Sequence, residues 1–86
     1  MPHIIAISAI TDQQGFDSAL KQAYARLPMG ARWTLAVGST DGTRAVNVIV
    51  HESVESASSF LEEHLGPYAT TDYLEADVAN AVGFPK

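Results

Sequence analysis

The sequence predicts an α+β domain, in which a four-stranded antiparallel sheet carries two helices on one face. Three observations predict it: residues 32–51 have the pattern of a β-hairpin, a helical pattern lies on each side of the hairpin, and one further strand lies beyond each helix. The order is therefore β-α-β-β-α-β, and right-handed crossovers place both helices on the same face. We predict a single domain over residues 1–86.

The hairpin is indicated by Asp41-Gly42, a pair that favours the two positive φ angles of a type I′ turn. This turn pairs Thr40 with Thr43 and fixes the register of both strands. One face of the strand pair is then wholly apolar and consists of Trp33, Leu35, Val37, Val46, Val48 and Val50. The other face is mixed and consists of Arg32, Thr34, Ala36, Gly38, Ala45, Asn47, Ile49 and His51.

The segment before the hairpin predicts a strand and a helix. Residues 3–10 form a short isoleucine-rich run, typical of a strand buried on both faces. Thr11 and Gln14 have the spacing of a capping box, and an apolar stripe then recurs at helical spacing as far as Leu27. Residues 28–30, Pro-Met-Gly, end this helix.

The segment after the hairpin predicts the second helix and the last strand. Ser53 is the expected N-cap, and Gly66-Pro67 ends the helix with glycine in a left-handed conformation. Residues 73–78 alternate as a strand, with Tyr73, Glu75 and Asp77 on one face. The tail that follows carries two apolar side chains that we expect to be buried, Val82 and Phe84.

Composition and charge exclude several classes of protein. The chain has a net charge of −5, and its five basic residues are scattered, which argues against a nucleic-acid partner. It contains no run of 18 apolar residues, so we expect no membrane span. The first residues lack the pattern of a signal peptide and there is no cysteine, so we expect a cytoplasmic protein.

The two sheet faces predict a partner. We expect the helices to cover the wholly apolar face, with Ile5 and Ile7 of the first strand pointing toward them. The mixed face then stays open, although it also carries apolar side chains, namely Ile4, Ala6, Ala36, Ala45 and Ile49. We therefore predict a homodimer through this sheet face. The polar groups on it, among them Ser8, Asn47 and His51, require hydrogen bonds or a wet cavity.

The order of elements is that of the ferredoxin-like fold, and the sequence resembles the dimeric α+β barrel superfamily. The similarity covers about residues 32–78 and is nearest to muconolactone isomerases, through the segments Trp33-Thr34-Leu35-Ala36-Val37-Gly38, Ser53-Val54-Glu55, Gly66-Pro67-Tyr68 and Leu74-Glu75-Ala76. The superfamily also contains small cofactor-free monooxygenases of the antibiotic-biosynthesis type and polyketide cyclases. The resemblance implies a homodimer with a small-molecule cavity and no metal or organic cofactor.

Two residues are candidates for acid–base chemistry. His51 ends a strand on the mixed face, and a histidine there can serve as an acid or a base; the alternative is a strand-end histidine in water or paired with a carboxylate. Glu75 shares a strand face with Asp77, the spacing at which two carboxylates perturb each other, although acidic residues also protect an edge strand from aggregation. We predict His51 and Glu75 as the residues that move protons.

Four further residues are candidates for ligand binding. Asn47 and Tyr73 are predicted to orient the ligand from the mixed face. Tyr68 and His64 flank the end of the second helix and are predicted to close a pocket entrance. A histidine at a helix C-terminus is also favoured by the helix dipole, and Tyr68 is equally explained as a packing residue.

Other chemistries have less support. The three histidines lack metal-ligand spacing, so we predict no metal site, and no nucleotide-binding or nucleophile motif is present. Pro2 suggests tautomerase chemistry only if Met1 is removed. We predict a homodimer that binds a small, partly apolar organic molecule and acts as a cofactor-independent isomerase, cyclase or monooxygenase. The alternative is a non-catalytic module whose sheet face serves only as a dimer interface.

Overall fold

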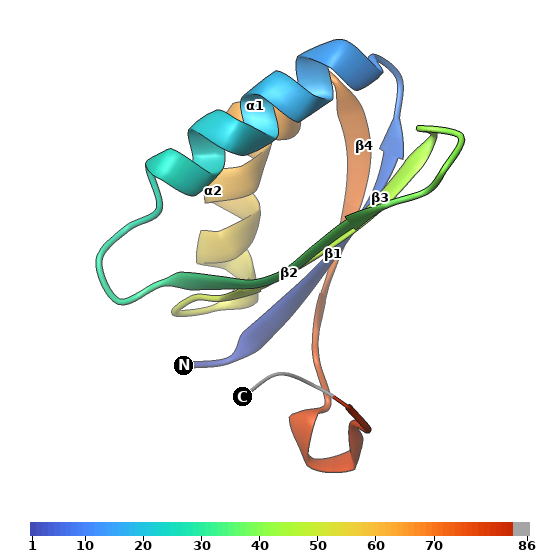
Figure 1. Ribbon diagram of the computed structural model, residues 1–86. Helices are drawn as coiled ribbons and strands as arrows, with labels where there is room; N and C mark the ends of the chain where they lie inside the picture. The colour runs from blue at the N-terminus through green and yellow to red at the C-terminus, as the bar shows by residue number, and fades with distance from the viewer. Residues whose placement is uncertain (84–86) are drawn as a thin grey trace.

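Four strands form one antiparallel sheet, and two helices lie across one of its faces (Figure 1). The computed structural model describes residues 1–83. Its elements are β1 (His3–Ile10), α1 (Gln13–Ala25), β2 (Arg32–Gly38), β3 (Arg44–Val50), α2 (Val54–Leu65), β4 (Ala69–Glu75) and a short 3₁₀ turn, η1 (Val78–Asn80). The sheet order is β2-β3-β1-β4, so β1 and β3 are central. This arrangement confirms the predicted ferredoxin-like α+β fold.

The helix caps agree with the sequence in one helix and differ in the other. Ser53 caps α2 as predicted, and its hydroxyl and that of Ser56 each accept a backbone N–H from the other residue, both at 3.0 Å. In α1 the N-cap is Asp12 instead of Thr11, because the Asp12 carboxylate accepts the N–H of Gly15 at 3.1 Å. The Thr11 hydroxyl donates instead to the carbonyl of Tyr68 at 3.0 Å, joining the start of α1 to the start of β4.

The last strand begins four residues earlier than the sequence predicts. β4 runs from Ala69 to Glu75, and Ala69 pairs with Ile10 at the far end of β1. Its first half is polar, so the apolar alternation that predicted residues 73–78 does not reveal it. Gly66 has a right-handed φ of −51° instead of the predicted left-handed one. Val82 is fully exposed instead of buried, and Phe84 lies outside the described residues.

The hairpin loop is wider than the predicted two-residue turn. The N–H of Gly42 donates to the carbonyl of Ser39 at 3.1 Å, and only Gly42 in the loop has a positive φ, of 75°. Asp41 accepts hydrogen bonds from the hydroxyls of Ser39 and Thr43, each at 2.7 Å, and these lower its pKa to about 2. The loop keeps the predicted register beside it, with Val37 opposite Val46.

A β-bulge at Thr34 changes the register of β2 before that point. Leu35 pairs with Val48 as predicted, but Trp33 pairs with Ile49 and not with Val50. A bulge inserts one unpaired residue, so every side chain before it turns to the opposite face. Trp33 therefore lies on the same face as Ile49, and the prediction that it shares a face with Leu35 is wrong.

The helices cover the mixed face of the sheet and not the apolar one, which reverses our expectation. The core contains Ile4, Ala6, Ala45 and Ile49 from the strands and Phe16, Ala19, Ala57, Leu61 and Leu65 from the helices. Small strand side chains provide the room for the large helical ones, because interiors are filled by complementary shapes. The open face carries Ile5, Ile7, Leu35, Val37, Val46, Val48, Val50 and Leu74.

Neither helix found in residues 1–83 is both long enough and apolar enough to cross a membrane.

Candidate ligand-binding groove

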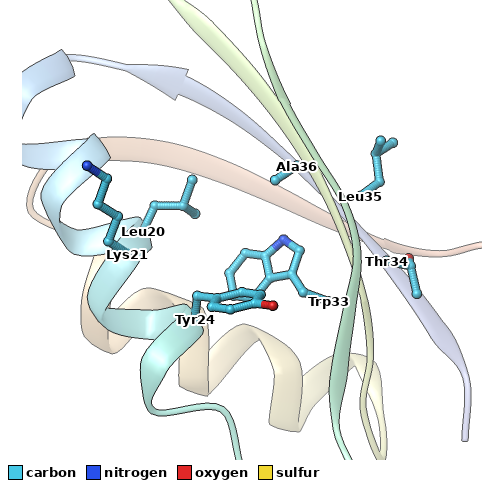
Figure 2. Close-up of a pocket in the computed structure, with 7 residues that line it drawn as sticks. All are labelled: Leu20, Lys21, Tyr24, Trp33, Thr34, Leu35 and Ala36. Atoms are coloured by element: carbon cyan, nitrogen blue, oxygen red, sulfur yellow. The ribbon is translucent and has the colours of Figure 1, made fainter.

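A groove runs between α1 and β2, on the helix side of the sheet. Its larger part is a hollow of about 410 Å³, with Leu20 and Tyr24 on one wall and Trp33 and Ala36 on the other (Figure 2). A narrower hollow of about 130 Å³ shares Leu20 and Ala36 with the first and extends toward the hairpin loop. Phe16 and Asn47 line this narrower part. The two hollows meet at Leu20 and Ala36 and are together called the groove below. Its larger part is mainly apolar, and the buried Asn47 lies at its inner end.

Two aromatic rings form one end of the larger hollow. The ring centroids of Tyr24 and Trp33 are 6.0 Å apart and their planes are inclined by 51°. Figure 2 shows both rings on the α1 side of β2, whereas Thr34 and Leu35 project from the other side. The bulge at Thr34 therefore supplies the indole ring to the groove. Bulges commonly redirect a side chain in this way beside functional sites.

Asn47 is the polar residue at the inner end of the groove. It lies in the middle of β3 with only 1% of its surface exposed, and its Oδ1 accepts the indole N–H of Trp33 at 3.1 Å. An indole nitrogen is only a donor, so the amide oxygen must face Trp33 and the NH₂ group must point elsewhere. This Nδ2 is buried and has no hydrogen-bond partner among the described residues. A buried donor without a partner costs about 1–3 kcal/mol.

His51 lies under α2 and does not line the groove. Its Nδ1 is 2.6 Å from the Ser56 hydroxyl, and its ring stacks on Phe60 with the centroids 6.1 Å apart. Only 7% of its surface is exposed. The predicted proton-transfer residue is thus part of the structure that holds the start of α2 on the sheet.

Glu75 and Tyr73 lie on β4, at the sheet edge opposite to β2. Glu75 is exposed and lines a surface hollow beside Met1 and Pro2. The Tyr73 hydroxyl donates to the carboxylate of Glu62 on α2 at 2.5 Å, and burial raises the pKa of the Tyr73 phenol. The structure therefore brings neither residue to Asn47, and no hydrogen bond within residues 1–83 joins His51 to Glu75.

His64 and Tyr68 do lie together, but in another place. Both line a hollow of about 300 Å³ between α1 and α2. The His64 Nδ1–H donates to the carbonyl of Phe60 at 3.0 Å. A Cβ on Gly15 would stand 2.4 Å from the Tyr68 ring, so this glycine lets the ring pack against α1. Of the six residues predicted for the site, Asn47 alone lines the groove.

The groove walls are not evident from the sequence. Leu20 and Tyr24 belong to the apolar stripe of the first helix, which predicts core positions, and the alternation of the hairpin places Trp33 on the apolar face. One signal was available: the single tryptophan needs an acceptor when buried, and Asn47 is the amide nearest to it in the hairpin register. Within residues 1–83 no cluster of three histidine or acidic side chains is placed to hold a metal ion.

The comparisons with family models, with curated proteins and with solved structures find no match to this chain.

Proposed function

We propose that this protein binds a small, planar, partly apolar organic molecule in the groove between α1 and β2. The ring of the ligand lies against Trp33, Tyr24 and Leu20, and the Asn47 amide donates a hydrogen bond to an acceptor atom of the ligand. The observation that carries the proposal is the buried Nδ2 of Asn47, which has no partner among the described residues.

The unpaired NH₂ group of Asn47 is unusual for a buried polar group. Most buried donors in folded proteins have a partner, so an exception needs an explanation. Leucine at this position would carry no NH₂ group, although it would leave the Trp33 indole N–H without its acceptor. Asparagine accepts that N–H but keeps its own NH₂ group buried and unpaired, in a residue that lines the narrower hollow. A ligand acceptor, such as a carbonyl oxygen, removes the cost of the unpaired donor. The hollows of about 410 and 130 Å³ offer the volume typical of small-molecule sites.

The proposal is one of binding, not of turnover. His51 and Glu75, which we predicted to move protons, lie outside the groove. The isomerase, cyclase or monooxygenase chemistry that we expected is therefore not supported by His51 and Glu75 at this site.

Acetophenone is a suitable probe because it combines one ring with one carbonyl acceptor. In ¹⁵N-labelled protein, Trp33 supplies the only indole N–H signal, and Asn47 and Asn80 supply the only two asparagine NH₂ pairs. We expect acetophenone to shift the Trp33 and Asn47 signals in a saturable way while the Asn80 signals stay fixed. Ethylbenzene, which lacks the acceptor, should bind at least several-fold more weakly.

Asn47→Leu provides the matched control for this experiment. The variant keeps the apolar walls, so acetophenone and ethylbenzene should bind it equally. If millimolar acetophenone moves neither signal of the unsubstituted protein, or if Asn47→Leu binds it as well, the proposed function is wrong.

We also propose that the protein is a homodimer through the open sheet face. Ile7, Leu35, Val37 and Leu74 are each more than one third exposed on this face, and isolated monomers rarely keep so many adjacent apolar side chains in water. A second copy is the favoured occupant because the face carries both charges at one end, Asp72 on β4 and Arg44, which begins β3 and also lines the narrower hollow. A two-fold axis that passes between these two residues presents unlike charges to each other.

The dimer is tested by light scattering after size-exclusion chromatography. We expect the mass of two chains for the unsubstituted protein and of one chain for Val37→Lys. Gln22→Lys, which adds the same charge on an exposed position of α1, should stay dimeric. A monomeric unsubstituted protein at 100 μM contradicts the dimer without affecting the proposed ligand site.

A further inference from the structure

We infer that the ligand of the groove is an organic anion, with a neutral acceptor at its inner end and its negative group at the mouth, beside Lys21. This inference rests on the proposed function and specifies the class of ligand. It is carried by the position of Lys21, by the charges that line the groove, and by the surroundings of Asn47.

The groove differs in charge from the rest of the chain. The protein has ten acidic and five basic residues, for a net charge of −5. Among residues 1–83, the charged side chains that line the two hollows are the basic Lys21 and Arg44 and the acidic Asp17. An anion is repelled by the protein as a whole and is attracted locally to this groove, which is the arrangement that directs a charged ligand to one site.

Of the residues that the structure describes, Lys21 is the only charged one that lines the larger hollow. It lies one position after Leu20 and three before Tyr24, so α1 places it at the border of the groove. Figure 2 shows its ammonium group extending away from Trp33. No ion pair or hydrogen bond engages it within residues 1–83. The lysine stem is flexible, and rotation about its bonds lets the ammonium group follow an anion at the mouth.

The inner end of the groove selects a neutral group. A carboxylate placed there loses its hydration and gains only the NH₂ group of Asn47, with the Asp17 carboxylate on the wall of the same hollow. Burying a charge with so little compensation is strongly unfavourable. A carbonyl oxygen needs only the one donor, so the charged group belongs at the solvent-exposed end. An aromatic ketone or lactone with an acid group on the opposite side of the ring meets both conditions.

The test compares 4-acetylbenzoate with 4-acetylbenzamide, a neutral probe of the same shape and with the same acetyl group. Affinities come from the Trp33 and Asn47 NMR signals at low ionic strength. We expect 4-acetylbenzoate to bind roughly two- to five-fold more tightly, which is the range of an exposed ion pair. The preference should disappear in Lys21→Met, which keeps the apolar stem, and should decrease in 0.5 M NaCl.

The outcomes separate this inference from the proposed function. Equal binding of the two probes to the unsubstituted protein, or a preference that survives in Lys21→Met, overturns the anionic class and leaves the groove as a binding site. If neither probe nor acetophenone binds, the proposed function fails as well. If 4-ethylbenzoate, which has no carbonyl opposite the acid, binds as tightly as 4-acetylbenzoate, then the acceptor part of the inference is wrong.

Discussion

The helices cover the more polar face of the sheet and leave the more apolar face open. The face that carries Ser8, Asn47 and the Trp33 indole is covered by the protein's own helices. The face formed by isoleucine, valine and leucine side chains is left open. Apolar burial alone favours the reverse arrangement. Asn47 and Trp33 thus lie at the inner side of a groove, and the apolar face is free to meet another molecule.

The strands therefore have two roles: one face packs against the helices, and the other presents partly exposed apolar side chains. On the covered face, small residues such as Ala6 and Ala45 let Phe16 and Leu61 approach the sheet, and the remaining space next to β2 is the groove. On the open face, Val48 and Val50 are nearly covered, whereas Ile7, Leu35, Val37 and Leu74 stay between 37% and 53% exposed. These four side chains therefore stabilise the monomer less than fully buried ones do. Substitutions on the two faces should therefore have different costs.

The largest expected effect is a truncation on the covered side. Leu61→Ala removes a side chain with no exposed surface and should lower the free energy of unfolding by about 2–5 kcal/mol. Leu35→Ala, at an open-face residue that is 43% exposed, is its matched control and should cost less than about 1 kcal/mol in the monomeric Val37→Lys background. Urea unfolding measures both. Equal costs would show that the two faces are equally buried.

The next effect concerns His51. His51→Ala removes the partner of the Ser56 hydroxyl and the ring that stacks on Phe60, so we expect a loss of about 1–3 kcal/mol in the free energy of unfolding. Acetophenone binding should stay unchanged, because His51 does not line the groove. If His51→Ala is fully folded at the assay temperature but binds acetophenone more weakly, then His51 takes part in ligand binding, as predicted from the sequence.

Asn47→Leu should change stability least among the buried positions. The substitution loses the hydrogen bond to Trp33 but also removes the unpaired N–H, and we expect the two contributions to cancel to within about 1 kcal/mol. Thermal unfolding without ligand measures this. A loss above about 3 kcal/mol would mean that Asn47 has a structural role and that its NH₂ group is satisfied in the free protein.

The smallest effect lies in the hairpin loop. Hydrogen bonds hold the folded pKa of Asp41 at about 2, below the ordinary value of 3.8, so they stabilise the folded state above pH 4 and this contribution is lost as the pH falls toward 2. The Asp41 carboxyl ¹³C signal should titrate near pH 2, and Ser39→Ala should move the midpoint toward 3.8. A midpoint near 3.8 in the unsubstituted protein would exclude these hydrogen bonds in solution.

Most of the fold is predictable from local patterns. The order of elements, the Ser53 cap and the pairing of Val37 with Val46 follow from periodicity, capping chemistry and turn residues. These signals lie within a few residues of the feature that they predict. The cap of α1 was displaced by one residue, because Asp12 competes successfully with Thr11 for the exposed N–H groups.

The site is not predictable in the same way, because it depends on one bulge. The segment Trp33-Thr34-Leu35 alternates perfectly, so the pattern assigns Trp33 to the face of Leu35. The hydrogen bond from the Trp33 indole to Asn47 and the contact with Tyr24 favour the other face, and both are tertiary contacts with no signature in the strand itself. Which face is covered likewise depends on how the helix side chains pack against the small strand residues Ala6 and Ala45.

The position of the Trp33 ring tests this account most directly. The NOESY spectrum of the protein contains a single indole N–H, so its contacts can be assigned without ambiguity. The account predicts cross-peaks from this proton to the Asn47 side chain, and from the indole ring to Tyr24. Cross-peaks from the ring to Leu35 and Val50 instead would place Trp33 on the open face, and neither the bulge nor the groove would then exist as described.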